Sequence, residues 1–92
     1  MHVDVRLSPA GDSYGAEVEG KHAGRLDFVR RGGTVVYTHT EVDAEFGGRG
    51  VGGALVRAAL DAARAEGAKV VPRCPFVKEW IGRHPEYADL VA

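Results

Sequence analysis

Cysteine is almost absent from this chain: Cys74 is the only one among 92 residues. One thiol cannot form an internal disulfide, which excludes a small secreted fold held together by cross-links. The first residues, Met1-His-Val-Asp, also lack the basic and apolar segments of a secretory signal peptide. Together these two features predict a protein of the reducing cytoplasm.

Long apolar runs and blocks of like charge are absent too. No run approaches the roughly 18 apolar residues of a membrane span, so no membrane association is expected. The 12 Lys and Arg residues nearly balance the 13 Asp and Glu residues, which argues against a nucleic-acid partner. No metal site is expected either, because no short zinc-ligand spacing joins His2, His22, His39, His84 and Cys74.

The length of the chain, 92 residues, leaves room for one hydrophobic core. Such a chain buries roughly 60–65% of its unfolded surface, with nothing left over for a second core. We therefore expect residues 1–92 to form a single domain with a compact active site.

The N-terminal half has the alternation of apolar and polar residues that is typical of half-buried strands. This pattern covers residues 3–7, 14–18 and 26–30, with a break at 8–12 and a turn expected at 20–24. A continuous β-branched segment, Thr34–Val42, follows a second turn at 31–33. Four consecutive strands with short connections favour an antiparallel meander.

The apolar period then changes to that of a helix. Val51, Leu55, Ala59 and Ala62 fall on one helical face, and Gly67 is expected to end the helix. A strand–helix–strand connection makes the two strands parallel, so the short strand predicted at residues 69–72 should run parallel to the β-branched one. A second helix with an apolar face is expected at residues 76–81, and one more turn at 86–91.

Five glycines lie between the last strand of the meander and the first helix: Gly47, Gly48, Gly50, Gly52 and Gly53. Without side chains in the way, backbone N–H groups can approach an anion, and the start of the helix adds unpaired N–H groups and a positive dipole. The loop therefore predicts binding of a phosphorylated cofactor.

Two better-known glycine motifs do not fit this loop. A P-loop ends in Gly-Lys-Ser/Thr, whereas this one continues as Gly52-Gly53-Ala54-Leu55, which argues against ATP or GTP hydrolysis. Residues 48–53 match the dinucleotide fingerprint by letter. However, the next strand leads into Arg73 instead of an acidic residue, and too little chain follows for a doubly wound sheet.

The order of elements and the loop resemble the Gcn5-related N-acetyltransferase superfamily, and within it the minimal subfamily of small acetyltransferase-like proteins. The family loop pattern, Gln/Arg-x-x-Gly-x-Gly/Ala, falls on residues 47–52, and residues 37–42, 48–55 and 74–87 carry the rest of the resemblance. It implies a truncated α/β (α+β) fold: an antiparallel meander leading to a central strand, a glycine-loop helix, a parallel splayed strand and short C-terminal helices.

This chain departs from the family pattern in two respects. Gly47 stands where the family has Gln or Arg, so one side-chain contact to the cofactor is missing, although the backbone cradle does not depend on it. The chain also lacks the paired N-terminal helices that often build the acceptor site in typical members, as well as the C-terminal strand hairpin.

The resemblance implies acetyl-CoA as the cofactor, with the coenzyme A pyrophosphate held by the glycine loop. The residues expected to contact it are Val42, Phe46, Gly47, Gly48, Arg49, Gly50, Val51, Gly52, Gly53, Cys74 and Phe76. Arg49 is either a phosphate contact or a solvated side chain at the helix start. Phe76 and Trp80 lie four residues apart on one helical face; the default interpretation of both is core packing, and Phe76 is also a candidate wall for the cofactor arm.

Acetyl transfer to an amine requires a held thioester, a polarised carbonyl, a base for the amine and a proton route to the thiolate. The resemblance implies that main-chain N–H groups near Glu41 or Val42 polarise the carbonyl. His39 and Glu41 lie two residues apart on one strand and share a face, so they form a candidate proton-handling pair, while Thr38 and Thr40 face the other way. The alternative is that both are ordinary surface groups.

Cys74 follows the splayed strand, where the resemblance implies the pantetheine arm of the cofactor. As a nucleophile it needs a pKa lowered by His39, by Arg73 or by a helix N-terminus; otherwise it is a small buried hydrophobe. Tyr87 lies in the region from which the wider family often supplies a general acid, with core packing as the alternative.

Three functions remain open from the sequence. The first is an acetyl-CoA-dependent N-acyltransferase acting on an unidentified protein, peptide or small amine, with Glu41, His39 or Cys74 in the chemistry. The second is an acyl-CoA-binding or sensing module without efficient transfer. The third is an interaction module that uses an uncovered sheet. A monomer or weak dimer is expected.

Overall fold

A computed structural model describes residues 2–92 and builds them around a five-stranded sheet in the order β1-β2-β3-β4-β5. The first four strands are antiparallel neighbours and β5 runs parallel to β4, which confirms the predicted meander and splayed strand. The strands are β1 (Asp4–Leu7), β2 (Ser13–Val18), β3 (Lys21–Arg31), β4 (Thr34–Val42) and β5 (Lys69–Pro72). This is the mixed α/β fold that the sequence predicted.

The helices lie C-terminal to the meander. The main helix is α1 (Val51–Glu66), and Gly67 ends it in the left-handed conformation with its N–H bonded to the carbonyl of Ala63, as expected. The others are α2 (Pro75–Arg83) and two short 3₁₀-helices, η1 (Ala44–Phe46) and η2 (Pro85–Leu90). The residues that were expected to form a second helix and a last turn therefore do so.

The hairpin turn expected at residues 20–24 is present, but it is shorter and lies earlier in the chain. Val18 pairs directly with Lys21, so the chain reverses over only two residues and β3 begins five residues before the pattern at 26–30. Glu19 and Gly20 both have positive φ, 51° and 81°, which is the geometry of a tight type I′ hairpin turn. A strained glutamate is hard to foresee at such a position, which explains the difference.

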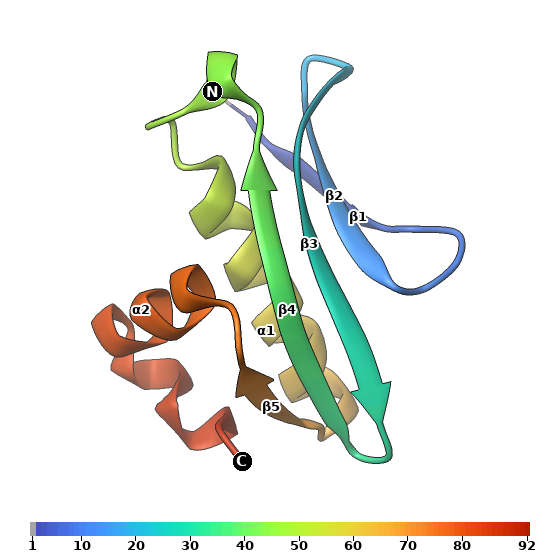
Figure 1. Ribbon diagram of the computed structural model, residues 1–92, viewed down its shortest axis with the longest axis vertical. Helices are drawn as coiled ribbons and strands as arrows, with labels where there is room; N and C mark the ends of the chain where they lie inside the picture. The colour runs from blue at the N-terminus through green and yellow to red at the C-terminus, as the bar shows by residue number, and fades with distance from the viewer. Residues whose placement is uncertain (1) are drawn as a thin grey trace.

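All the helices pack against one face of the sheet. Figure 1 views the opposite face, with α1 behind β4 and with α2 beside α1. Leu55, Val56 and Leu60 of α1 are fully buried, and the Tyr37 hydroxyl of β4 donates a 3.2 Å hydrogen bond to the Ala59 carbonyl. Among the described residues no helix covers the other face, which we call the open face.

A β-bulge in the β3–β4 pair decides which side chains reach the open face. Phe28 pairs with Tyr37 but Asp27 pairs with His39, so one residue of β4, Thr38, is extra. Tyr37 faces α1, and the extra residue reverses the alternation beyond it. Thr40 therefore faces the helices, opposite the fully buried Leu26, while His39 and Glu41 lie on the open face.

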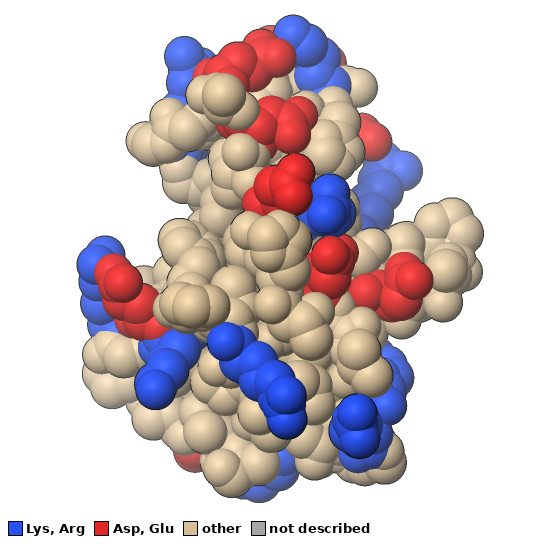
Figure 2. Space-filling view, in the orientation of Figure 1, with Lys and Arg blue, Asp and Glu red and all other residues tan. Residues whose placement is uncertain are grey.

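Both charge signs occur on the side seen in Figure 2, with basic side chains prevailing in its lower part and most acidic ones in its upper part and centre. Within residues 2–92 no helix has both the length and the apolar character needed to cross a bilayer. In the same residues no three or more His, Cys, Asp or Glu side chains gather as a metal site would require.

Candidate active site

The parallel strands β4 and β5 pair only over their first four residues. Their register runs from Thr34 with Lys69 to Tyr37 with Pro72, and β4 then continues to Val42 paired only with β3, without a described strand on its β5 side. The Asp43 N–H bonds to Ala23 on the β3 side, so by strand alternation the N–H groups of Val42 and Thr40 point into the gap. This is the splay that the resemblance implied, and it exposes backbone donors near the expected thioester.

The glycine loop closes one end of this gap. Gly48 and Gly50 have φ values of 72° and 82°, a left-handed conformation that side chains rarely adopt, and Gly50 leads directly into α1. A cavity of about 320 Å³ lies against the loop. Its lining brings together nine of the residues that the sequence nominated for cofactor contact: Val42, Phe46, Gly47, Gly48, Gly50, Val51, Gly52, Gly53 and Phe76.

The start of α1 leaves its first N–H groups free. The first hydrogen bond inside the helix is from Ala54 to Gly50, and no side chain caps the N-terminus. In the part of the chain that the structure describes, the N–H groups of Val51, Gly52 and Gly53 have no backbone acceptor. Converging donors at the positive end of a helix dipole are suited to a phosphate.

Aromatic side chains of α2 cover the start of α1. A Cβ on Gly52 would lie 2.7 Å from Cζ of Phe76, and one on Gly53 would lie 3.3 Å from Nε1 of Trp80. The default core interpretation of Phe76 is wrong, because its side chain remains 45% exposed, whereas Trp80 packs partly buried against the core. Phe76 stays exposed because its ring lies across the surface of α1 at Gly52, where it forms a wall of the cavity.

Arg49 is exposed in the turn between Gly48 and Gly50 and does not line the cavity. Its backbone N–H donates a 3.3 Å hydrogen bond to the Phe46 carbonyl. The phosphate contact of Arg49 stays a prediction.

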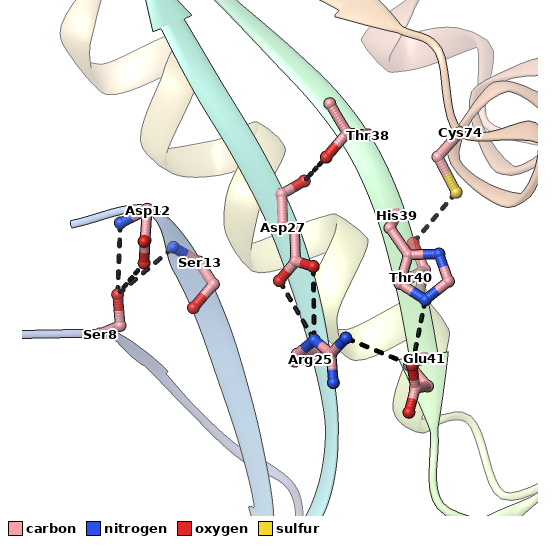
Figure 3. Close-up of polar contacts among 10 residues, drawn as sticks. All are labelled: Ser8, Asp12, Ser13, Arg25, Asp27, Thr38, His39, Thr40, Glu41 and Cys74. Atoms are coloured by element: carbon pink, nitrogen blue, oxygen red, sulfur yellow. Dashed lines mark hydrogen bonds and ion pairs between the residues drawn. The ribbon is translucent and has the colours of Figure 1, made fainter. Parts of the chain in front are cut away.

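Cys74 lies at the other side of the gap, as the residue that precedes α2. Its N–H donates to the Tyr37 carbonyl at 2.9 Å, and its Sγ lies 3.3 Å from the Thr40 hydroxyl. The side chain is only 5% exposed. The thiol therefore faces the unpaired end of β4 from the helix side of the sheet (Figure 3).

The pKa of the Cys74 thiol is lowered by this environment. Burial alone raises the pKa, but hydrogen bonds from the Thr40 hydroxyl and from the N–H groups of Val77, Phe76 and Thr40 outweigh it. Of the three activating neighbours considered from the sequence, the helix N-terminus is the one found here. A thiolate held by N–H donors is the form of cysteine that acts as a nucleophile.

We expect Thr40→Val to slow alkylation of Cys74 at neutral pH and to move its pH profile upward. The thiolate is the reactive form, and loss of the hydroxyl removes the largest of the groups that lower its pKa. The measurement is the iodoacetamide reaction rate as a function of pH. Thr38→Val is the matched control on the same strand, because the Thr38 hydroxyl bonds to the Asp27 carbonyl instead. Equal profiles for all three proteins would show that Thr40 does not set the thiol pKa.

His39 and Glu41 are paired on the open face, as their spacing predicted. Nε2 of His39 lies 3.0 Å from Oε2 of Glu41, and Nη2 of Arg25 lies 3.3 Å from the same oxygen. Figure 3 shows Glu41 between the other two, with Arg25 reaching it from β3 and His39 from two residues away along β4. The hydrogen bond from His39, followed by the charge of Arg25, lowers the pKa of Glu41.

Glu41 is about half exposed, and its lowered pKa keeps it in the carboxylate form. A carboxylate that stays ionised is only an acceptor, so the His39 nitrogen beside it must carry the proton. The other ring nitrogen, Nδ1, is then an acceptor. The arrangement thus favours His39 as the proton acceptor and Glu41 as the group that orients it.

Tyr87 has a different set of partners. Its hydroxyl donates to Asp61 at 2.7 Å and accepts from Arg57 at 3.3 Å, and its ring packs 5.4 Å from that of Trp80. The hydrogen bond to Asp61 is the main cause of its raised pKa. Its hydrogen bonds go to the middle of α1 and not to Cys74 or Glu41, and the residue is buried, so the core interpretation suits it best.

Sequence reasoning missed three residues of this site: Thr40, Arg25 and Gly24. A Cβ on Gly24 would lie 2.6 Å from the Glu41 carbonyl oxygen, so β3 and β4 approach each other there as only glycine permits. A glycine in the interior of an otherwise alternating strand was the one available clue. The roles of Thr40 and Arg25 depend on the strand register, which no local pattern reveals.

Comparison with known proteins agrees with this geometry. The model of the family described as GCN5-related N-acetyl-transferase matches residues 13–90. The chain therefore belongs to the GCN5-related N-acetyltransferase family, as the resemblance in its sequence indicated. None of the curated protein sequences matches the chain.

Solved structures share the fold. The solution structure of a GCN5-like protein from Staphylococcus aureus superimposes with a TM-score of 0.75 and 22% identity, over 97% of this chain and 87% of that one. The ribosomal-protein-S18-alanine N-acetyltransferase of Escherichia coli gives 0.61 and 19%, over 63% of this chain and 38% of that one. N-acetylglutamate synthase from Neisseria gonorrhoeae, solved with coenzyme A and N-acetyl-glutamate, gives 0.62 and 15%, over 89% and 22%. The chain thus spans well under half the length of the two larger enzymes.

Proposed function

We propose that this protein is an acetyl-CoA-dependent N-acetyltransferase that passes the acetyl group through Cys74 to an amine. The observation that carries the proposal is the position of a thiol with a lowered pKa at the gap between β4 and β5; Cys74 does not itself line the cavity at the glycine loop, but it precedes the wall residue Phe76 by two positions. A cradle alone would suit a binding module, whereas an activated nucleophile beside it suits transfer.

The residues present fit coenzyme A. The free N–H groups of Val51, Gly52 and Gly53 would hold its pyrophosphate, and a Cβ at Gly52 would intrude on Phe76, which walls the same cavity. The unpaired end of β4 would accept the pantetheine arm, as a strand edge accepts another extended chain. Bound acetyl-CoA would supply an acetyl group activated as a thioester.

The residues around Cys74 suit the transfer of the acetyl group from Sγ to the acceptor amine. The amine nitrogen forms a bond to the acetyl carbon on Cys74 while the bond from that carbon to Sγ breaks. Sγ leaves as a thiolate, which Thr40 and the N–H groups at the start of α2 stabilise. The amine reaches the acetyl carbon past the unpaired edge of β4, and its proton passes to Nδ1 of His39 on the open face, with Glu41 holding the opposite ring nitrogen.

Calorimetric titration with coenzyme A and acetyl-CoA, followed by intact mass analysis, tests this proposal. We expect binding of both and the gain of one acetyl group that Cys74→Ala abolishes and that neutral hydroxylamine removes, since hydroxylamine cleaves thioesters but not amides. Cys74 is the only cysteine, so the adduct has one possible thiol.

The other outcomes discriminate between the remaining functions. Binding and turnover with an intact Cys74→Ala rate would indicate direct transfer to the amine. Binding without adduct or turnover on any amine would favour a sensing module. No binding of coenzyme A would remove the cofactor on which the proposal depends.

A further inference from the structure

A row of residues in register crosses four strands of the open face. Arg6 pairs with Gly15, Gly15 with Arg25, and Arg25 with Glu41. Arg25 and Glu41 are also joined by an ion pair at 3.3 Å, which places the whole row on the side away from α1. The proton-handling pair of the proposed reaction therefore lies at one end of a line that leads to Arg6 at the other.

The surface along this row has a hollow at Gly15. A cavity of about 470 Å³ lies there, larger than the one at the glycine loop, and its lining includes Gly15, Arg6, Arg25 and Glu17. Nothing lies within 4 Å of the point where a Gly15 Cβ would be, so the missing side chain is what opens the floor. A volume of several hundred Å³ is the usual size of a small-molecule site.

The charges around the hollow favour a carboxylate. Its lining contributes the guanidinium groups of Arg6 and Arg25 against the single carboxylate of Glu17. Arg25 is held in place by Asp27 at 3.3 Å and by Glu41, which occupy its Nε and Nη2 atoms and leave Nη1 without a partner among the described residues. Arg6 forms no ion pair with any described residue, so its guanidinium and Nη1 of Arg25 are the donors left for a ligand beside the glycine floor.

The spacing sets the length of the ligand. Neighbouring strands lie 4.7–4.9 Å apart, so Glu41 and Gly15, separated by β3, are about 10 Å apart across the sheet. An amine beside His39 and Glu41 and an anion over Gly15 would therefore be separated by about that distance. A fully extended chain of about eight bonds meets this requirement.

We propose that the hollow at Gly15 binds the carboxylate of the acceptor, and that the acceptor is an ω-amino acid whose amine reaches His39 across β3. This inference rests on the proposed acetyl transfer and names the substrate class for it. The acceptor enters from the open face, while the cofactor lies on the glycine-loop side, so the two substrates meet at the unpaired edge of β4.

A series of matched amines tests the proposal. Acetyl transfer is measured for ω-aminooctanoate and for octylamine, which differ in the carboxylate, and for glycine, in which the two groups are too close to span the distance. We expect kcat/KM for ω-aminooctanoate to exceed that for octylamine by about tenfold, the effect of one charge-assisted pairing at a partly exposed site. Glycine should be a poor acceptor.

Three variants locate the effect. Gly15→Val fills the hollow without a clash at Cβ, and Arg6→Gln removes one guanidinium from it; each should abolish the preference for the carboxylate while leaving octylamine acetylation unchanged. Arg31→Gln is the control, because Arg31 is an equally exposed arginine of β3 outside the hollow. Its preference should equal that of the unaltered protein.

A binding measurement with the candidate acceptor in the absence of coenzyme A tests this inference independently of the proposed function. Titration of the isotope-labelled protein with ω-aminooctanoate should shift the Gly15 amide resonance saturably, and Arg6→Gln should remove the shift. This result would support the carboxylate site even if coenzyme A did not bind. Efficient acetyl transfer with equal rates for ω-aminooctanoate and octylamine would overturn the inference and leave the proposed function standing, and an unmoved Gly15 resonance would also overturn it.

Discussion

Replacing Gly52 with alanine weakens coenzyme A binding by about tenfold or more, equivalent to at least about 1.4 kcal/mol, while the protein stays folded. The added Cβ would lie 2.7 Å from the Phe76 ring, which must move, and the methyl group would narrow the approach to the free N–H groups of α1. Phe76 is half-exposed and can swing outward, so the stability cost is small while the wall of the cradle is lost.

Calorimetric titration with coenzyme A measures this effect, and urea unfolding checks the fold. Gly82→Ala is the matched control: Gly82 is also helical, has open space at its Cβ and lies outside the cavity. It should bind coenzyme A normally and gain about 0.5–1 kcal/mol in stability, since alanine is the better helix former. An unaltered Kd for Gly52→Ala would exclude this cavity as the cofactor site.

Replacing Gly24 with alanine destabilises the fold by about 1–3 kcal/mol, a large part of the roughly 5–15 kcal/mol that holds a typical domain together. Its Cβ would lie 2.6 Å from the Glu41 carbonyl oxygen and 3.3 Å from Cα of Val42. Both obstacles are backbone atoms, so no side chain can rotate away and β3 must separate from the end of β4.

Urea denaturation measures this loss as a lower midpoint at an unchanged slope. Gly33→Ala serves as the control, because Gly33 lies in the turn between β3 and β4 with a normal φ and nothing near its Cβ. Its stability should change by less than about 0.5 kcal/mol. A Gly24→Ala protein as stable as this control would show that the two strands are not in close contact at Glu41.

Much of this molecule could be predicted from local patterns. Alternation located the meander strands, the change to a helical period located α1, and the glycines located the loop between them. Each of these features depends on residues a few positions apart, where geometry and sequence are tightly linked. The residues that line the cavity were all among those nominated from the sequence for the same reason, because nearly all of them come from one continuous segment, Phe46 to Gly53.

The features that escaped prediction all depend on how strands align. No glycine or proline marks the position of the bulge at Thr38 in the sequence. The contact between Thr40 and Cys74, which depends on this bulge, could therefore not be foreseen. Arg25 reaches Glu41 only because their strands are in register. Phe76 had the spacing of a core residue, and only the absence of a side chain at Gly52, on another helix, leaves its ring at the surface.

The bulge at Thr38 keeps two chemically incompatible neighbours apart. If β4 carried the same residues in regular alternation, Glu41 and His39 would face the helices, and a carboxylate would share the pocket of the Cys74 thiol. A negative charge there would hold the thiol protonated and silence it as a nucleophile. The bulge thus keeps the thiol and the carboxylate on opposite faces of the sheet, so that each group keeps its own electrostatic surroundings.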